Sequence, residues 1–504
     1  MKDTETGIDR RTFVGTVGAV AGMGAMGLSG GPMRPAWGAE ESKAIDGPAI
    51  DQAVALAEHY DPTYSGPDDL VKGNTPDEYA SLGCTTTSVW ELNRWRHEMV
   101  DQAEEFVRED GTVEPAVYNK LRVLFHSYAG GIGPSTYESG QCIDLFKILF
   151  TEEEAGIYLE MPFGVEFTPA QFAQESGREE EECKQICEDF AQRALLYHAH
   201  RSGIDYYHHL AVWHGLCEYG LERFYDQDYA RLFVDAFKSP QTISGPAYNS
   251  SLHAGTPLYH VLPCDESVVS DEEGILPLQD YNKIIDRNEV IGVSPCMCRL
   301  RKATYQGETV PYFGTEELKT YVSPICGHKI ETCFSFGEEA EYYIERGIAR
   351  QIGQEEARRL LAENVQAGFV LESCCTSGSE IICCCHGDCC GPLSGFKAIG
   401  TETCAASTSF IHISDYILDY DREACIQCGA CVERCPMEAI AMDEDNRPIV
   451  SGVCVRCGQC GLACPVGART LHARPAEERL PMSDSFIDDY NRKAGFRYDH
   501  GQLA

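Results

Sequence analysis

Two cysteine-rich runs near the C-terminus constrain this chain more than any other feature. The first run comprises Cys425, Cys428, Cys431 and Cys435, the second comprises Cys454, Cys457, Cys460 and Cys464, and a proline follows each run. The C-x2-C-x2-C spacing places three sulfurs around one pocket, which is typical of cuboidal 4Fe-4S clusters. Paired zinc sites or disulfides are the alternative, but neither uses two complete four-cysteine runs. The chain is therefore expected to fold around iron-sulfur clusters and to move electrons.

The segment from about Asp421 to His472 resembles the bacterial two-cluster ferredoxin family. Gly429 and Gly458 each follow the second cysteine of a run, and Ala468 begins the place of the closing strand. The resemblance implies a short strand, helix and strand repeated around two 4Fe-4S clusters. In such modules the fourth ligand comes from the other run. The expected cofactor-binding and metal-ligating residues are then Cys425, Cys428, Cys431 and Cys464 for one cluster, and Cys454, Cys457, Cys460 and Cys435 for the other.

The N-terminus resembles a twin-arginine export signal. Arg10 and Arg11 are followed one residue later by Phe13, and the Gly/Ala-rich stretch after them is too short for a confident membrane span. We expect residues 1–39 to be the signal, cleaved after Ala39 or kept as an anchor; a plain basic N-terminus is the alternative. Export of folded protein would allow clusters to be inserted before crossing. The predicted location is the periplasm or the outer face of the cytoplasmic membrane, with the export machinery as one partner.

Charge and composition narrow the possible partners. The chain has 504 residues, 43% of them apolar, and a formal net charge of -38. This length and apolar content predict several domains with cores of their own. The acidic balance argues against nucleic acid as a partner, since phosphate contacts need clustered Lys and Arg. It is explained either by solvation of a large surface or by steering of a basic redox partner.

The predicted fold class is α+β and multidomain. After the signal we expect a mostly helical region at 40–150, a winged-helix-like region at 151–265 and a Cys-rich central α/β region at 266–415. The ferredoxin-type domain at 416–473 and a polar tail at 474–504 complete the chain. In the second region Thr168 and Pro169 favour a helix start, and Ser202-Gly203 favours a hairpin. The acidic run 179–182 would repel phosphate, so this region is expected to be a scaffold and not a DNA reader.

Twelve further cysteines lie between Cys296 and Cys404. Packing alone does not explain a cysteine triplet followed by a histidine and a cysteine pair. We expect a further metal centre, iron-sulfur or zinc, with disulfides or inert thiols as the alternative. His328 and His386 would either bind the metal or donate hydrogen bonds to its ligands. The candidate ligand sets are Cys296, Cys298, Cys326 and Cys333, or Cys383, Cys385, Cys389 and Cys390, or a combination of the two.

The order of these cysteine groups resembles a group of multidomain 4Fe-4S binding proteins of anaerobic bacteria and archaea. The resemblance spans roughly residues 151–471 and rests on Cys296-x-Cys298-Arg299, the later central cysteines and the terminal module. It implies electron transfer and assigns no substrate. The Cys384, His386 and Asp388 positions depart from the pattern of that group.

Two functions remain open. The chain is either an exported electron-transfer protein, or the electron-transfer subunit of an anaerobic oxidoreductase complex, that passes single electrons to a membrane or envelope redox partner. Alternatively it is a self-contained reductase with a catalytic metal centre in the central region, similar to corrinoid-dependent reductive dehalogenases in layout only. No catalytic residue can be assigned. The polar aromatic patch at 206–209 is better explained by packing.

The export signal predicts a result for a reporter. Residues 1–45 fused to a folded reporter should carry it out of the cytoplasm of a host with an active twin-arginine system, and replacing Arg10 and Arg11 by lysine should retain it. Cell fractionation measures the outcome. Cytoplasmic retention with both arginines intact would contradict the targeting hypothesis.

Overall fold

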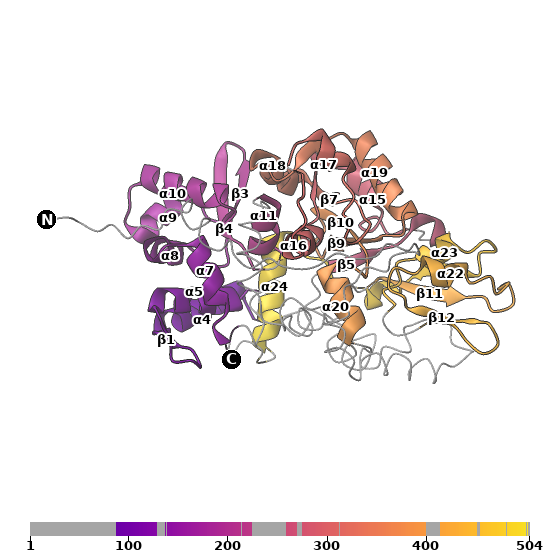
Figure 1. Cartoon of the computed structure of the whole chain (residues 1–504). Coiled ribbons are helices and arrows are strands. Elements are labelled where there is room, and N and C mark those ends of the chain that lie inside the picture. Colours follow the sequence, from indigo (N-terminus) through magenta and orange to yellow (C-terminus); the bar gives the residue numbers. More distant parts are fainter. Residues whose placement is uncertain are drawn as a thin grey trace, which may run out of the picture.

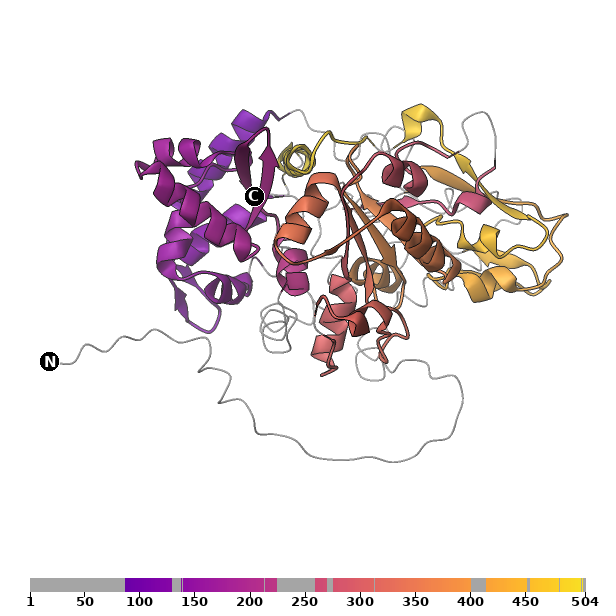
Figure 2. The ribbon, with the colours of Figure 1, turned by 90° about the horizontal axis from the view of Figure 1, so that it is seen from above.

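The computed structural model describes residues 87–128, 137, 139–212, 214–223, 259–269, 275–311, 313–399, 414–450, 454–479, 481–499 and 501. The expected signal at 1–39, the start of the helical region at 40–86, and Cys404 lie outside the described residues. The described chain is a mixture of helix and strand with a ferredoxin-type module near its C-terminus. Helical segments lie at one end of the molecule and this module at the other, with the central region between them (Figures 1 and 2).

The N-terminal part is helical, as expected. It contains α4 (Val89–Gln102), α5 (Ala116–His126) and α7 (Cys142–Leu149), with the short strands β1 (Phe106–Val107) and β2 (Val113–Glu114). Ser88 begins α4 through a capping box with Glu91. Leu121, Phe125 and Phe146 are fully buried in the core that joins these helices. Burial of these aliphatic and aromatic side chains holds the bundle together.

The next segment has the predicted order of helices and hairpin. It contains α8 (Glu152–Leu159), α9 (Pro169–Ser176), α10 (Glu180–Gln192), and the hairpin of β3 (Leu196–Arg201) and β4 (Ile204–His209). Thr168 caps α9 with Pro169 at its first position, and Gly177 ends it at φ 73°. Cys183 and Cys187 lie on the buried face of α10. Their role here is packing, which is the usual role of buried thiols on an apolar helix face.

The central region is built on a six-stranded sheet. Its strand order is β5-β9-β10-β7-β6-β8, and every neighbouring pair is antiparallel. The strands are β5 (Tyr259–Leu262), β9 (Val370–Cys374), β10 (Ile381–Cys385), β7 (Glu331–Phe336), β6 (Ile291–Pro295) and β8 (Arg350–Ile352). The expected mixture of helix and strand is present, but an antiparallel sheet belongs to the α+β class and not to the alternating α/β class.

Helices and short turns surround this sheet. They are α11 (Leu216–Arg223), η3 (Asp265–Ser267), α15 (Tyr281–Asp286), α16 (Met297–Tyr305), α17 (Glu316–Thr320), α18 (Gly337–Glu345), α19 (Gln354–Gln366) and α20 (Gly391–Ile399). The side chains of β10 alternate between two cores: Ile382 packs with Phe334 and Leu361, whereas Ile381 belongs to the larger core shared with the N-terminal part. This alternation decides which cysteines of β10 can meet.

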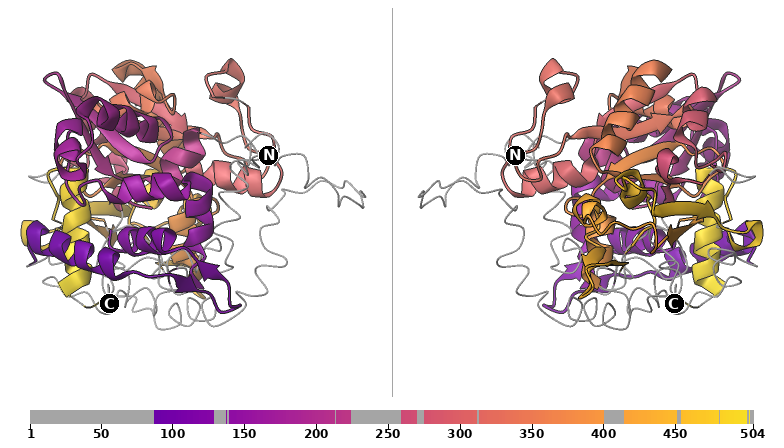
Figure 3. Two further views of the ribbon diagram at one scale, coloured as in Figure 1. Left: turned by 90° about the vertical axis from the view of Figure 1, so that its left-hand side faces the viewer. Right: turned by 90° about the vertical axis from the view of Figure 1, so that its right-hand side faces the viewer.

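The C-terminal module repeats the predicted strand, helix and strand. Strand β11 (Tyr416–Tyr420) pairs with β14 (Arg469–Ala473), and β12 (Ile440–Met442) pairs with β13 (Pro448–Val450). The short helices α22 (Ala430–Arg434) and α23 (Gln459–Leu462) contact each other between these ladders. The two ends of the molecule are seen separately in Figure 3.

The last segment is part of the fold. Residues 474–504 are expected as a polar tail, but after η5 (Ala476–Glu478) they form α24 (Phe486–Asp499), which packs against α4 (Figure 1). Tyr490 is buried and donates a hydrogen bond to the carbonyl oxygen of His214, and Asn491 donates to the carbonyl oxygen of Gly164 at 2.8 Å. No helix within the described ranges is long and apolar enough to cross a lipid bilayer.

The burial of α24 predicts a stability effect. Tyr490→Ala should lower the free energy of unfolding by about 3 to 5 kcal/mol, because it leaves a cavity and an unpaired carbonyl. Tyr498→Ala, on the exposed side of the same helix, should cost less than about 1 kcal/mol. Denaturant unfolding measures both. Equal effects of the two substitutions would mean that α24 does not hold the fold together.

Candidate metal centres

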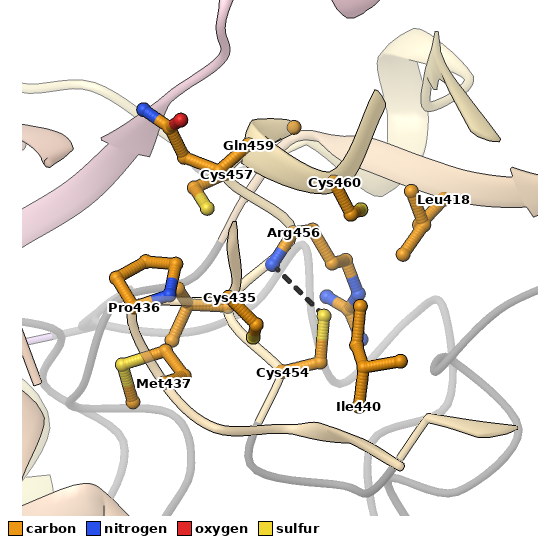
Figure 4. A pocket seen from close by; sticks show the side chains of 12 residues that line it. Leu418, Cys435, Pro436, Met437, Ile440, Cys454, Arg456, Cys457, Gln459 and Cys460 are labelled. Atoms are coloured by element: carbon orange, nitrogen blue, oxygen red, sulfur yellow. Dashed lines mark hydrogen bonds between the residues drawn. The ribbon is translucent and has the colours of Figure 1, made fainter. Parts of the chain in front are cut away.

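The eight cysteines of the C-terminal module line two separate cavities, four to each. One cavity is lined by Cys425, Cys428, Cys431 and Cys464, and the other by Cys435, Cys454, Cys457 and Cys460. Figure 4 shows the second cavity, with all four of its thiol groups around one space. Each set is the crossed grouping predicted from the sequence. Four thiols around one apolar cavity fit the donor set of a 4Fe-4S cluster.

Backbone N–H groups point at the sulfurs of both cavities in the same pattern. Gln427 and Arg456 occupy equivalent positions with φ of 59° and 55°, and their N–H groups donate to Cys425 Sγ and Cys454 Sγ at 3.4 Å. In the same way, the N–H of Ala439 donates to Cys435 Sγ and the N–H of Ala468 donates to Cys464 Sγ, both at 3.2 Å. A left-handed conformation is costly for residues other than glycine. Here it directs N–H donors at sulfur, an arrangement that favours the thiolate form and fits the donor set of an iron-sulfur cluster.

The two cavities differ in exposure. At the rim of the first, Cys428 is exposed and the side chains of Ile426 and Val466 are 59% and 43% exposed. In the second, Cys457 and Cys460 are buried. The first cavity therefore faces the solvent, and we call it the outer cavity. The second faces the protein interior, and we call it the inner cavity.

The second cavity is joined to the central region by direct hydrogen bonds. Gln459 Nε2 donates to the carbonyl oxygens of Val365 and Phe369 at 2.9 and 2.8 Å. The N–H of Gly387 donates to the carbonyl oxygen of Pro436 at 3.2 Å. A Cβ at Gly387 would collide with that oxygen, so glycine is needed for this close approach. Because Pro436 follows Cys435, the contact links a cysteine of the second cavity to the central cysteine loop.

Strand register brings distant central cysteines together. In the sheet Cys383 lies opposite Cys333 on one side and opposite Glu372 on the other. Residues directly opposite in neighbouring strands share a face, and Cys385 shares it by alternation. Cys384 lies on the other face, in the separate core of Ile382. The sheet thus selects two of the three consecutive cysteines of β10 for one face.

Two helix starts complete this group. Cys296 and Cys298 lie at the start of α16, and Cys390 immediately precedes α20, where the N–H of Gly391 donates to Cys298 Sγ at 3.3 Å. Thiol contacts run from Cys296 to Cys298, Cys390, Cys385, Cys383 and Cys333 in that order. We call these residues the six-thiol group.

Buried acidic side chains surround the six-thiol group. A carboxylate oxygen of Glu372 lies within 4.8 Å of the sulfurs of Cys385 and Cys390. Glu222 is buried near Cys296 and accepts a hydrogen bond from Ser294 at 3.2 Å. Burial raises the pKa of Glu222 well above its usual value and that of Glu218 to about 7. A carboxyl group with a raised pKa keeps its proton to a higher pH than usual. Sequence reasoning missed these acids, because nothing in the local sequence marks them.

The remaining two candidate thiols form a separate group. Cys326 contacts Cys389 instead of Cys296, Cys298 or Cys333, and Cys389 is separated from Cys383 and Cys385. Neither of the two ligand sets proposed from the sequence is therefore gathered by itself, whereas the six-thiol group takes three cysteines from each, as in the combination that the sequence left open. The pairing of β7 with β10 brings Cys333 to Cys383, which belongs to the other predicted set. The tight turn at 386–389 then directs Cys389 toward Cys326 and Cys390 toward Cys385.

The histidines singled out from the sequence lie in two different places. His328 and His386 lie beside Cys389, where Asp388 contacts both imidazoles. His208 and His209 are buried among aromatic rings, with His208 stacked on Tyr197 and His209 beside Tyr158. The patch at 206–209 therefore packs the hairpin, as expected.

Comparison with known families gives one match. Residues 417–465 match the family described as the 4Fe-4S dicluster domain. No curated protein and no solved structure gave a match to the chain. The cavities and this match together support iron-sulfur clusters in the C-terminal module, and such a domain suggests iron-sulfur electron transfer.

The crossed grouping predicts which cluster each cysteine serves. Cys435→Ser should remove the cluster of the inner cavity and about four irons, while Cys464→Ser should remove the outer one. Iron analysis and electron paramagnetic resonance of the reduced protein distinguish the two. Cys183→Ser, a buried thiol far from both cavities, is the control. Loss of the outer cluster in Cys435→Ser would contradict the assignment.

Proposed function

We propose that this chain is an exported iron-sulfur protein that passes single electrons from a redox partner through two 4Fe-4S clusters to a third centre held by the six-thiol group. It acts alone or as the electron-transfer subunit of an anaerobic oxidoreductase complex. The observation that carries the proposal is the contact between Gly387 and Pro436, which joins the inner cluster cavity to the loop that supplies Cys390.

The outer cavity is the proposed entry point for electrons. Its lining includes the exposed apolar side chains of Ile426 and Val466, and the exposed acids Asp421 and Glu423 precede its first cysteine, Cys425, in the chain. An apolar centre with a charged rim is common at protein interfaces. Together with the net charge of -38, this rim favours a basic redox protein of the membrane or envelope as the partner, because opposite charge accelerates encounter. Export itself is supported by the paired arginines of the N-terminus.

The six-thiol group suits iron and sulfide better than zinc. This group offers six thiols and a carboxylate from Glu372, but no imidazole among its members, and four thiolates are the donor set of a 4Fe-4S cluster. Thiolates are the usual ligands of iron-sulfur clusters. The bound cluster would accept and release electrons, and the protein would supply the thiolates, the hydrogen bond from Gly391 and the nearby acids.

The segment at 151–209 is proposed to be a winged-helix-like scaffold. Its α10 begins with the exposed acids Glu180, Glu181 and Glu182, which would repel a phosphate backbone. Its hairpin is held by the central region: Arg201 pairs with Glu338 at 2.5 Å, and Tyr342 donates to the carbonyl oxygen of Leu196 at 3.0 Å. These contacts attach the hairpin to α18, which packs against the central sheet.

A second candidate function is a self-contained reductase that acts at the six-thiol group. The observation that favours it is the set of buried acids at that group. Glu222 lies beside Cys296 and Cys383, and Glu218 and His214 are buried nearby. Reduction of an organic substrate consumes protons together with electrons, whereas a pure electron carrier has no need of such acids. Substrate turnover by the purified chain would decide for the reductase.

Metal content tests the third centre. Anaerobically purified protein should contain about twelve irons and twelve sulfides, because three clusters of four are expected. Cys385→Ser should lose about four of each and keep the two signals of the terminal module. Cys384→Ser is the matched control, since Cys384 lies on the opposite face of β10. About eight irons in the unaltered protein would contradict the third centre and leave a two-cluster carrier.

A further inference from the structure

The group around Cys326 and Cys389 has the composition of a mononuclear metal site. The ligand atoms of His328, Asp388 and Cys389 all lie within 4.8 Å of one another. The thiol of Cys326 contacts that of Cys389. One imidazole, one carboxylate and one thiol therefore converge on one place outside the six-thiol group, and a second thiol, that of Cys326, adjoins them through its contact with Cys389.

Two loops with defined backbones position these ligands. In the loop before β7, the N–H of Gly327 donates to the carbonyl oxygen of Ser323 at 2.8 Å. The N–H of Ser323 donates to the carbonyl oxygen of His328 at 2.9 Å. Gly327 has φ of 70°, a conformation that glycine adopts readily. The resulting tight loop brings Cys326 and His328 to the same site.

The second loop follows β10. The N–H groups of Cys389 and Cys390 both donate to the carbonyl oxygen of His386, at 3.1 and 2.9 Å. This turn sends Cys390 toward Cys298 and Cys385, and Cys389 toward Cys326. The adjacent cysteines therefore belong to different groups.

Burial and charge at this place suit a bound cation. The thiols are inside, with Cys326 and Cys389 only 6% and 4% exposed, whereas the side chains of His328 and Asp388 are 19% and 29% exposed. An ion could thus enter from the outer side. The buried guanidinium of Arg299 lies 3.5 Å from Cys389 Sγ, where it offsets part of the negative charge of two thiolates.

The second histidine has a supporting position. His386 Nδ1 lies 2.9 Å from Asp388 Oδ1, while the other carboxylate oxygen, Oδ2, lies 3.1 Å from His328 Nε2. A partner of this kind fixes the orientation of a ligating side chain. His386 is therefore a positioning residue for Asp388.

We propose that Cys326, Cys389, His328 and Asp388 bind one zinc ion, separate from the centre in the six-thiol group. Zinc favours four ligands drawn from thiolate, imidazole and carboxylate, whereas a 4Fe-4S cluster takes mainly thiolates. The ion would tie the loop before β7 to the turn after β10. It would thereby hold Gly387 against Pro436 and Cys390 in the six-thiol group. This inference does not depend on what the other centres do.

Metal analysis of the full-length protein tests the site. Anaerobically purified protein from zinc-supplemented cells should contain about one zinc per chain. Cys389→Ser and His328→Gln should each lose the zinc and keep most of the iron. Cys390→Ser, the neighbouring thiol, should lose iron and keep the zinc. Should Cys389→Ser be insoluble, the more exposed His328→Gln still reports on the site.

Cobalt gives a second readout that does not use activity. Protein produced with cobalt should show thiolate-to-cobalt charge transfer and the visible bands of a tetrahedral ion, and the difference spectrum against His328→Gln should isolate them. Zinc absent from the unaltered protein, zinc kept by both Cys389→Ser and His328→Gln, or about one iron at this place instead of zinc would each overturn the proposal. The iron content of the six-thiol group is measured in the same samples, so failure there is distinguished from failure here.

Discussion

Buried thiolate charge is the constraint on which the rest of this structure depends. Metals bind deprotonated thiols, and gathering several such charges inside a protein is costly without compensation. In the C-terminal module the compensation comes from backbone N–H groups, which residues such as Gln427 and Arg456 aim at sulfur by adopting left-handed conformations. In the central region the guanidinium of Arg299 lies beside Cys389. Backbone N–H groups thus compensate thiolate charge in the terminal module, and the buried guanidinium of Arg299 does so in the central region.

The central sheet distributes the cysteines of β10 between its two faces. Cys383 and Cys385 share one face of β10 with the opposing Cys333, whereas Cys384 lies in the core on the other face. A thiol on a packed face behaves as a small apolar side chain. The number of cysteines in this region therefore exceeds the number available to any one metal centre, and the pleat of the strand makes the distinction.

The two cavities and the six-thiol group follow one another from the solvent inward. The outer cavity meets the solvent at Cys428, the inner cavity is buried against the central region, and the Gly387 contact continues toward the six-thiol group. Two buried acids, Glu222 and Glu372, lie beside the six-thiol group. A site that combines electrons from the clusters with protons from carboxyl groups would have both at the same place. The loop from His386 to Cys390 contacts the inner cavity through Gly387, the six-thiol group through Cys390, and Cys326 through Cys389. These three contacts account for its many reactive side chains.

Within the C-terminal module, the sequence by itself predicted which four cysteines line each cavity and the strand-helix-strand repeat, because short spacings along the chain place these cysteines. Local signals also determined the start of α9 at Thr168 and the hairpin at Ser202-Gly203. Only the tertiary structure decided how the central thiols divide, since periodicity tells which face a residue occupies but not which distant strand lies opposite. For the same reason only the fold brought Glu222 and Glu372 to the thiols. The burial of α24 was also decided by tertiary packing: its many charged residues predict a solvated tail, but Tyr490 is buried and bonded to His214, which is distant in the sequence.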